Sequence, residues 1–109
     1  MFSIGYVMKL KPGQYAGYQE AHDNLWPTIA ASMSDNHVSM SIYHFDDLLF
    51  LHAVAPNEEA WNKSREHPDL PKWAEFMTEF LETKEDGTAY FPELDEVFAF
   101  GEFRSTPSR

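Results

Sequence analysis

The first eleven residues alternate between apolar and mostly small or charged side chains. One face of an extended chain would carry Phe2, Ile4, Tyr6, Met8 and Leu10, and the other would carry Ser3, Gly5, Val7, Lys9 and Lys11. A period of two is typical of a β-strand, because successive side chains point to opposite faces. The pattern therefore predicts a strand over 2–11, which Pro12-Gly13 ends.

Between residues 13 and 35 the apolar positions recur every three or four residues instead. This spacing predicts an amphipathic helix, which runs out at Ser34-Asp35-Asn36. Pro27 lies inside it, removes one backbone donor and crowds the preceding turn. We therefore expect the helix to kink or split at Pro27.

The rest of the chain predicts a hairpin, a broken helix and a last strand. Strands are expected over 37–45 and 48–55, around Asp46-Asp47. A helix should begin near Pro56, break at His67-Pro68 and resume over 70–83. A polar loop follows, and 94–103 has the apolar character of a strand. Residues 105–109 are expected to form a frayed tail.

This order of elements, β-α-β-β-α-β, is that of the ferredoxin-like α+β fold, with helices on one face of a four-stranded antiparallel sheet. We expect a single domain over 1–104. Several strands are apolar on both faces, so the second sheet face also needs a cover. A second copy packing sheet to sheet would supply it, which predicts a dimeric α+β barrel and hence a homodimer.

Charge narrows the classes of partner. The chain has 8 basic and 18 acidic residues, which gives 8 − 18 = −10. Such a protein repels nucleic acids and anionic membranes, so neither is an expected partner, and a neutral ligand fits better. The absence of cysteine excludes disulfides, thiolate zinc sites and cysteine nucleophiles. With no leader and no long apolar run, we expect a soluble, cytoplasmic protein.

The most informative motif is Tyr18-x-x-x-His22-x-x-x-Trp26-Pro27. Residues four apart share a helix face, so a hydroxyl, an imidazole and an indole would line up. Together they suit a small polyhydroxylated ligand, because they offer a hydrogen-bonding group, a proton carrier and a flat apolar surface. The alternative is an ordinary amphipathic helix on which His22 only packs.

Other candidates have simpler explanations. His44 and His52 lie on the expected hairpin strands, but nothing brings them to one metal, so we interpret them as core or interface residues. Glu58-Glu59 suit a helix start, and the acidic residues near 93–96 suit a solvated surface. The chain contains no glycine-rich phosphate loop and no nucleophile elbow.

Over most of its length the chain resembles the L-rhamnose mutarotase family. The resemblance is carried by stretches in the same order and spacing: Tyr6-Val7-Met8, Leu10-Lys11-Pro12-Gly13, the Tyr18–Pro27 motif, Ser41-Ile42-Tyr43, Leu48-Leu49-Phe50, Trp61, Lys72-Trp73 with Met77, and Leu94-x-Glu96-Val97-Phe98. The resemblance implies a dimeric ferredoxin-like barrel that interconverts the anomers of a 6-deoxyhexose without metal or cofactor.

Residue by residue, the resemblance makes His22 the proton donor and Tyr18 a substrate-contacting tyrosine. Trp73 matches the first of two adjacent tryptophans in the family's sugar site. Ala74 replaces the second, Met40 stands where a tyrosine is expected, and Lys84–Thr88 replaces the family's Asn-Pro-rich loop. These departures all fall on the expected pocket.

The resulting hypothesis is an aldose mutarotase acting on L-rhamnose or a related 6-deoxyhexose such as L-fucose. His22 would be the general acid, and Tyr18, Trp26 and Trp73 would form the sugar pocket. Two alternatives remain: a cofactor-free oxygenase or cyclase of the same barrel type, and a non-catalytic sugar-binding module.

Overall fold

The computed structural model describes residues 1–104, and its centre is a three-stranded antiparallel sheet. The strands are β1 (Phe2–Lys9), β2 (Ser39–Phe45) and β3 (Leu48–Ala55). Their order across the sheet is β1-β3-β2, so β3 pairs with both neighbours. Three of the predicted strands are thereby confirmed, and the turn between β2 and β3 places Asp46 at a φ of 54°.

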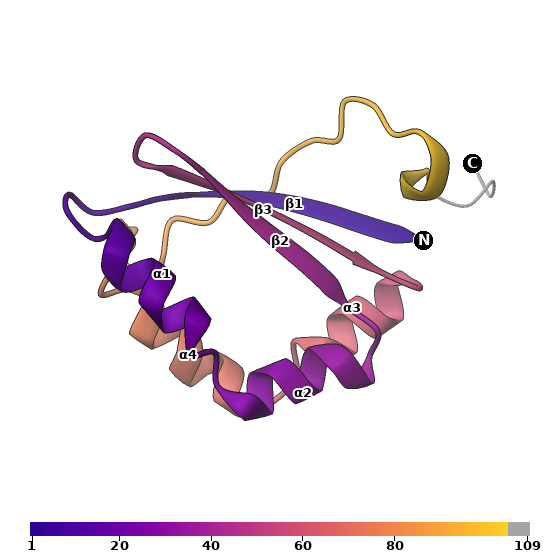
Figure 1. Cartoon of the computed structure of the whole chain (residues 1–109), viewed down its shortest axis with the longest axis horizontal. Helices are drawn as coiled ribbons and strands as arrows, with labels where there is room; N and C mark the ends of the chain where they lie inside the picture. The colour runs from indigo at the N-terminus through magenta and orange to yellow at the C-terminus, as the bar shows by residue number, and fades with distance from the viewer. Residues whose placement is uncertain (105–109) are drawn as a thin grey trace.

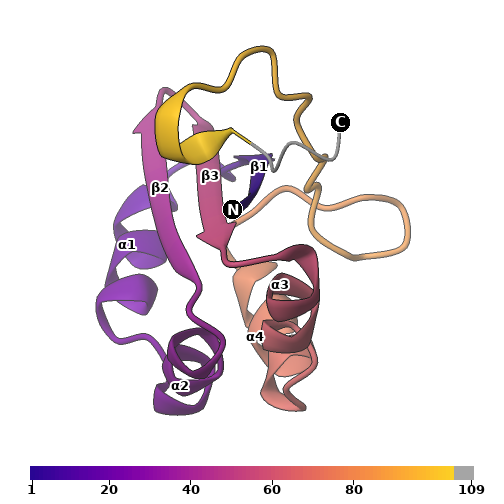
Figure 2. The same cartoon turned by 90° about the vertical axis from the view of Figure 1, so that its right-hand side faces the viewer.

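Four helices cover one face of this sheet (Figure 1). They are α1 (Tyr15–Asp23), α2 (Pro27–Asp35), α3 (Glu58–Ser64) and α4 (Asp69–Met77). Turned by 90°, the structure shows α1 and α2 beneath β2, with α3 and α4 beside them (Figure 2). None of the helices within residues 1–104 is long and apolar enough to cross a membrane.

The predicted break at Pro27 is confirmed as a complete split. Helix α1 ends at Asp23, and Pro27 occupies the first turn of α2, where its missing N–H costs nothing. Trp26 precedes that turn with an extended ψ of 131°. The prediction that Tyr18, His22 and Trp26 share one helix face was therefore wrong for Trp26, because the chain turns before it.

The last helix is shorter than predicted, since α4 ends at Met77 and not at residue 83. The next residues instead fold back along the end of β1, where Leu81 forms an isolated bridge with Leu10. Phe80 from this turn packs against Gly17 of α1. A Cβ built on Gly17 would lie 2.8 Å from the Phe80 ring, so only glycine permits this close approach.

The predicted fourth strand over 94–103 was wrong. The chain meets β1 only around Glu93, which bridges Tyr6, through Val7 N–H donating to Pro92 O at 3.1 Å and Leu94 N–H donating to Gly5 O at 2.8 Å. It then leaves the β1 edge, and residues 101–103 form a short 3₁₀ helix, η1 (Gly101–Phe103). The apolar pattern indicated an extended chain, but within residues 1–104 the side chains of Val97, Phe98 and Phe100 stay 97%, 80% and 73% exposed. The α+β class holds, with three strands in place of four.

The core lies between the helices and the inner sheet face. Along β3, Leu49, Leu51, Ala53 and Ala55 are buried and alternate with half-exposed residues.

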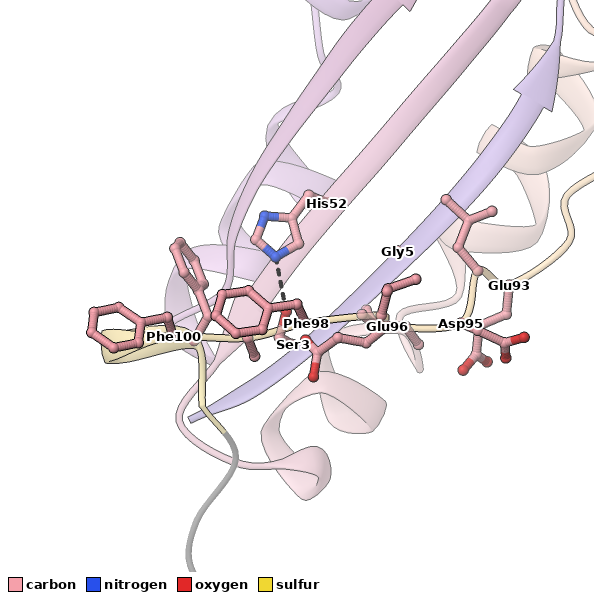
Figure 3. Close-up of a pocket in the computed structure, with 13 residues that line it drawn as sticks. Ser3, Gly5, His52, Glu93, Asp95, Glu96, Phe98 and Phe100 are labelled. Atoms are coloured by element: carbon pink, nitrogen blue, oxygen red, sulfur yellow. Dashed lines mark hydrogen bonds between the residues drawn. The ribbon is translucent and has the colours of Figure 1, made fainter.

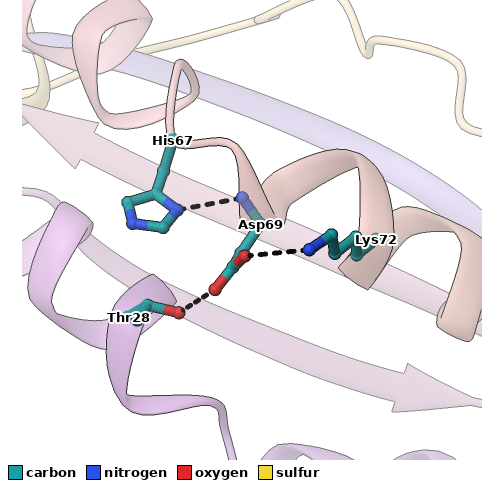
Figure 4. A network of polar contacts seen from close by, with 4 residues as sticks. All are labelled: Thr28, His67, Asp69 and Lys72. Atoms are coloured by element: carbon teal, nitrogen blue, oxygen red, sulfur yellow. Dashed lines mark hydrogen bonds and ion pairs between the residues drawn. The ribbon is translucent and has the colours of Figure 1, made fainter.

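Polar contacts also join the helices: the Thr28 hydroxyl of α2 donates to the Asp69 carboxylate of α4, which also faces Lys72, while His67 accepts from the Asp69 N–H (Figure 4). The predicted tail at 105–109 lies outside the described residues.

Candidate functional site

A cavity of about 440 Å³ lies between the inner sheet face and the helices. Its volume falls within the range of roughly 300–1,000 Å³ typical of small-molecule sites. Strand residues Met8, Met40 and Leu51 form its roof, and α1, α2, α4 and the 81–91 segment form its walls. Among the predicted site residues, Tyr18, His22 and Trp73 line it.

His22 is held in one orientation by its own helix. Its Nδ1 lies 2.9 Å from the backbone carbonyl of Tyr18, one turn earlier. A carbonyl only accepts hydrogen bonds, so Nδ1 carries the proton and Nε2 is left with a lone pair. No hydrogen bond to Nε2 is formed within residues 1–104. The half-buried imidazole thus offers the cavity a proton acceptor of fixed tautomer.

Burial lowers the pKa of His22 below its ordinary value of 6.5, because desolvation penalises the imidazolium. The hydrogen bond to the Tyr18 carbonyl and the charge of Asp23 oppose this pKa shift without cancelling it. At neutral pH the side chain is therefore mainly the neutral imidazole, ready to take up a proton and return it.

Tyr18 packs directly on His22, with 4.2 Å between the two ring centroids. Its side chain is buried, and its hydroxyl lies 3.9 Å from Met8 Sδ, a weak acceptor. Burial raises the pKa of the phenol, so it stays protonated at any physiological pH. The hydroxyl is thus a poorly partnered donor at the cavity wall.

Trp73 of α4 provides the aromatic surface of the site. Its ring lies edge-on to His22, with 5.3 Å between centroids. Trp26 does not line the cavity. It packs edge-on to Trp73 at 5.1 Å and stacks on Phe76, so it supports Trp73 from behind. Of the four predicted site residues, the structure brings three to the cavity and places the fourth against one of them.

The pocket positions that depart from the family pattern also line the cavity. Met40 lies in the roof, and Ala74 and Lys84 lie in the walls. Met40, together with Met8, Met33 and Met77, gives much of the lining a flexible, apolar character. Met40 was expected at the pocket from the family resemblance, whereas Met8, Met33 and Met77 were not predicted as site residues.

The family model described as L-rhamnose mutarotase matches residues 3–100. The chain belongs to the L-rhamnose mutarotase family. It is therefore a carbohydrate isomerase, and the predicted resemblance is confirmed.

Relatives in this family align over nearly the full chain. An L-rhamnose mutarotase of Clostridium beijerinckii is 29% identical over 101 residues, covering 90% of this chain and 97% of its own. One from Rhizobium meliloti is 31% identical with the same coverage. The crystal structure of L-rhamnose mutarotase from Formosa agariphila superposes with a TM-score of 0.76 at 29% identity, covering 93% of this chain and all of that one.

The other histidines of this family member lie away from the cavity. His44 stacks on Tyr15 with 3.8 Å between ring centroids, and His52 Nε2 lies 2.8 Å from the Ser3 hydroxyl on the outer sheet face (Figure 3). Across residues 1–104, no group of three or more His, Asp or Glu side chains is arranged to hold a metal.

Proposed function

We propose that this member of the L-rhamnose mutarotase family interconverts the α and β anomers of L-rhamnose or a related 6-deoxyhexose such as L-fucose. One observation carries the proposal. His22 has a fixed tautomer, and no described residue hydrogen-bonds its Nε2 at the wall of a largely apolar cavity. Mutarotation needs one positioned proton carrier and a cavity that holds a sugar ring, and this arrangement provides both.

The chemistry follows from the tautomer of His22. Nε2 takes the proton of the anomeric hydroxyl, the C1–O1 bond becomes a carbonyl, and the bond from C1 to the ring oxygen breaks. The imidazolium then protonates the ring oxygen, so His22 acts as a general acid in the second half of this step. Rotation about C1–C2 and the reverse sequence close the ring on the other face. No proton or electron is gained or lost overall.

In the proposed reaction, three aromatic side chains help to bind the sugar. The edge and face of Trp73 suit the C–H side of a sugar ring, and Trp26 keeps Trp73 in place. The Tyr18 hydroxyl, whose present partner is a thioether, is available to a sugar hydroxyl. The apolar part of the lining around Met40 suits the C–H and methyl groups of a 6-deoxyhexose.

Anomer-exchange NMR on L-rhamnose tests the activity directly. Catalytic amounts of protein should transfer saturation between the two anomeric protons faster than buffer alone, and L-fucose measured alongside reports the sugar range. If the folded protein accelerates exchange of neither sugar, nor of other aldoses, the proposal is wrong. That result would favour the cofactor-free oxygenase or cyclase, or the sugar-binding module.

We further propose that the protein is a homodimer formed over the outer sheet face. Val97, Phe98 and Phe100 are 97%, 80% and 73% exposed, and Tyr43 and Phe45 at the edge strand are 67% and 68% exposed. The segment from Glu93 to Phe100 lines one hollow with Ser3 and His52 of this face (Figure 3). Apolar side chains so exposed on adjacent elements are typical of an interface. A second copy of the same face would cover them.

Sedimentation equilibrium tests the assembly. The wild-type protein should sediment as a dimer, and Phe98→Asp should shift it toward the monomer because a carboxylate would be buried at the interface. Glu96→Gln, at a neighbour that is also exposed, is the control and should remain dimeric. A monomeric wild type at high concentration would overturn the assembly and leave the proposed activity untouched.

A further inference from the structure

The cavity is electrically unlike the rest of this protein. Although the chain carries 18 acidic residues, none of them lines the cavity. Its charged lining consists of Arg65 and Lys84, in addition to the titratable His22. The two cations come from separate parts of the chain, the end of α3 and the segment after α4. The fold therefore gathers positive charge at one site of a protein whose net charge is −10.

The Arg65 guanidinium is held in place without a carboxylate. Its Cζ lies 5.1 Å from the centroid of the Trp61 ring, a cation–π contact that fixes the planar group over the indole. Within residues 1–104 the ion pairs are Lys9–Asp47 and Lys72–Asp69, so neither Arg65 nor Lys84 has an acidic partner at that range. Desolvation lowers the pKa of Arg65, and the nearby Tyr6 opposes this shift, although the residue as a whole is exposed.

Two carboxylates act on this end of the cavity from farther away. Glu93 lies across β1 at Tyr6, whose hydroxyl also feels Arg65, and Asp86 lies near Lys84 in the same loop. The Asp86 carboxylate is already occupied by the hydroxyl and the N–H of Thr88. Neither acid lines the cavity, so Arg65 remains a cation of the cavity lining with no acidic partner in ion-pair range within residues 1–104.

We propose that the cavity also binds aldoses that carry a carboxylate, the alduronates, with Arg65 as the residue that selects them and Lys84 as a second cation. A guanidinium presents parallel N–H groups that match a carboxylate in a bidentate pair. A single carboxylate also suits the small cavity better than a doubly charged phosphate, which the strongly negative protein would repel. This inference rests on the proposed mutarotase activity and extends its substrates from neutral to acidic sugars.

The test uses sugar pairs that differ only at C6. L-mannuronate is compared with L-rhamnose, and D-galacturonate with D-fucose, by anomer-exchange NMR for kcat/KM and by saturation-transfer NMR for Kd. In the wild type, the uronate of at least one pair should bind more tightly than its deoxy partner. Arg65→Gln should reduce that preference by about tenfold or more, because a charge-assisted bidentate contact is lost.

Lys63→Gln is the matched control, since Lys63 is an exposed cation on α3 that does not line the cavity. It removes the same charge and should leave the preference unchanged. Equal loss in both variants would reduce the effect to net charge and overturn the role of Arg65. Weaker binding of both uronates than of their deoxy partners, with no response to Arg65→Gln, would overturn the inference.

The two proposals fail separately in this experiment. Exchange of L-rhamnose without uronate binding removes only the inference about acidic sugars. Uronate binding that depends on Arg65, without exchange of any sugar, removes the proposed mutarotase activity and keeps Arg65 as the selecting residue.

Discussion

The two faces of the sheet differ in how far a single chain completes them. On the inner face, β3 side chains such as Leu49 and Ala53 are 1% exposed, and helices close over them to leave one cavity. On the outer face, Phe50 and His52 from the same strand are half-exposed, and the segment after Glu93 crosses without pairing beyond Leu94. One side of β3 therefore belongs to a buried core, and its other side belongs to a partly exposed surface.

The difference indicates where function resides. The inner face holds the only described proton carrier that combines burial, a fixed tautomer and a cavity, namely His22 among residues 1–104. The outer face holds exposed apolar side chains and a Ser3–His52 contact, and its hollow is lined by exposed phenylalanines such as Phe98 and Phe100. We therefore assign the chemistry to the inner face and the assembly to the outer face.

Neighbouring residues of β3 allow the strongest test of this division. Leu49→Ala should lower the free energy of unfolding by about 2–5 kcal/mol, because it leaves a void in a packed core. Phe50→Ala should cost about 1 kcal/mol in the monomer, since its side chain is only partly covered. Urea unfolding, followed at two protein concentrations, measures both changes.

The dependence on protein concentration distinguishes the two substitutions further. The loss caused by Leu49→Ala should be equal at both concentrations, whereas that caused by Phe50→Ala should grow at the higher concentration, where the wild type gains from dimerisation. If both variants responded to concentration in the same way, the two faces would not have the separate roles assigned to them.

Acid should lower the free energy of unfolding through protonation of His22 on the inner face. Its folded pKa is below 6.5, so the unfolded chain binds more protons as the pH falls, and the folded state loses stability in that range. The unfolding free energy of the wild type should therefore decline below pH 6.5. His22→Gln should show a smaller decline, by the share of this one group. Exchange activity should fall over the same range, because the neutral imidazole is the form that accepts a proton.

A smaller effect is expected from Tyr18→Phe. The Tyr18 hydroxyl has only the Met8 thioether as a partner, so its removal should leave the free energy of unfolding nearly unchanged. If the hydroxyl binds sugar, KM should rise by up to about tenfold while kcat changes less. A large loss of stability instead would assign the hydroxyl to the core, and equal kinetics would exclude it from the sugar site.

Much of the fold and part of the site were predictable from local patterns. The period-two run over 2–11 predicted β1, the two runs around Asp46-Asp47 predicted β2 and β3, and Pro27 predicted the break between α1 and α2, because these signals are local in the sequence. The absence of a fourth strand could not be predicted from the sequence. The pattern around Val97 and Phe98 indicates an apolar, extended chain, but it does not show whether a neighbouring strand pairs with it. The early end of α4 at Met77 likewise depends on a contact between residues far apart in the sequence, the bridge between Leu81 and Leu10.

Within the site, His22 and Tyr18 were predictable because they lie one helical turn apart. The prediction for Trp26 was wrong for the same reason, because the four-residue spacing continues past Asp23, where α1 ends. Arg65 was missed because its approach to the cavity depends on where α3 ends and on stacking over Trp61, which no local spacing reveals.

The central claim is that His22 carries the proton at the inner-face cavity, and its most direct test is the anomer exchange of L-rhamnose by His22→Gln. Glutamine keeps a polar group of similar size but has no titratable nitrogen. We expect the folded variant to lose about 10²- to 10⁴-fold in kcat, the usual contribution of a positioned general acid–base group, while sugar binding persists. A folded His22→Gln protein that equilibrates L-rhamnose anomers as fast as the wild type would contradict the account.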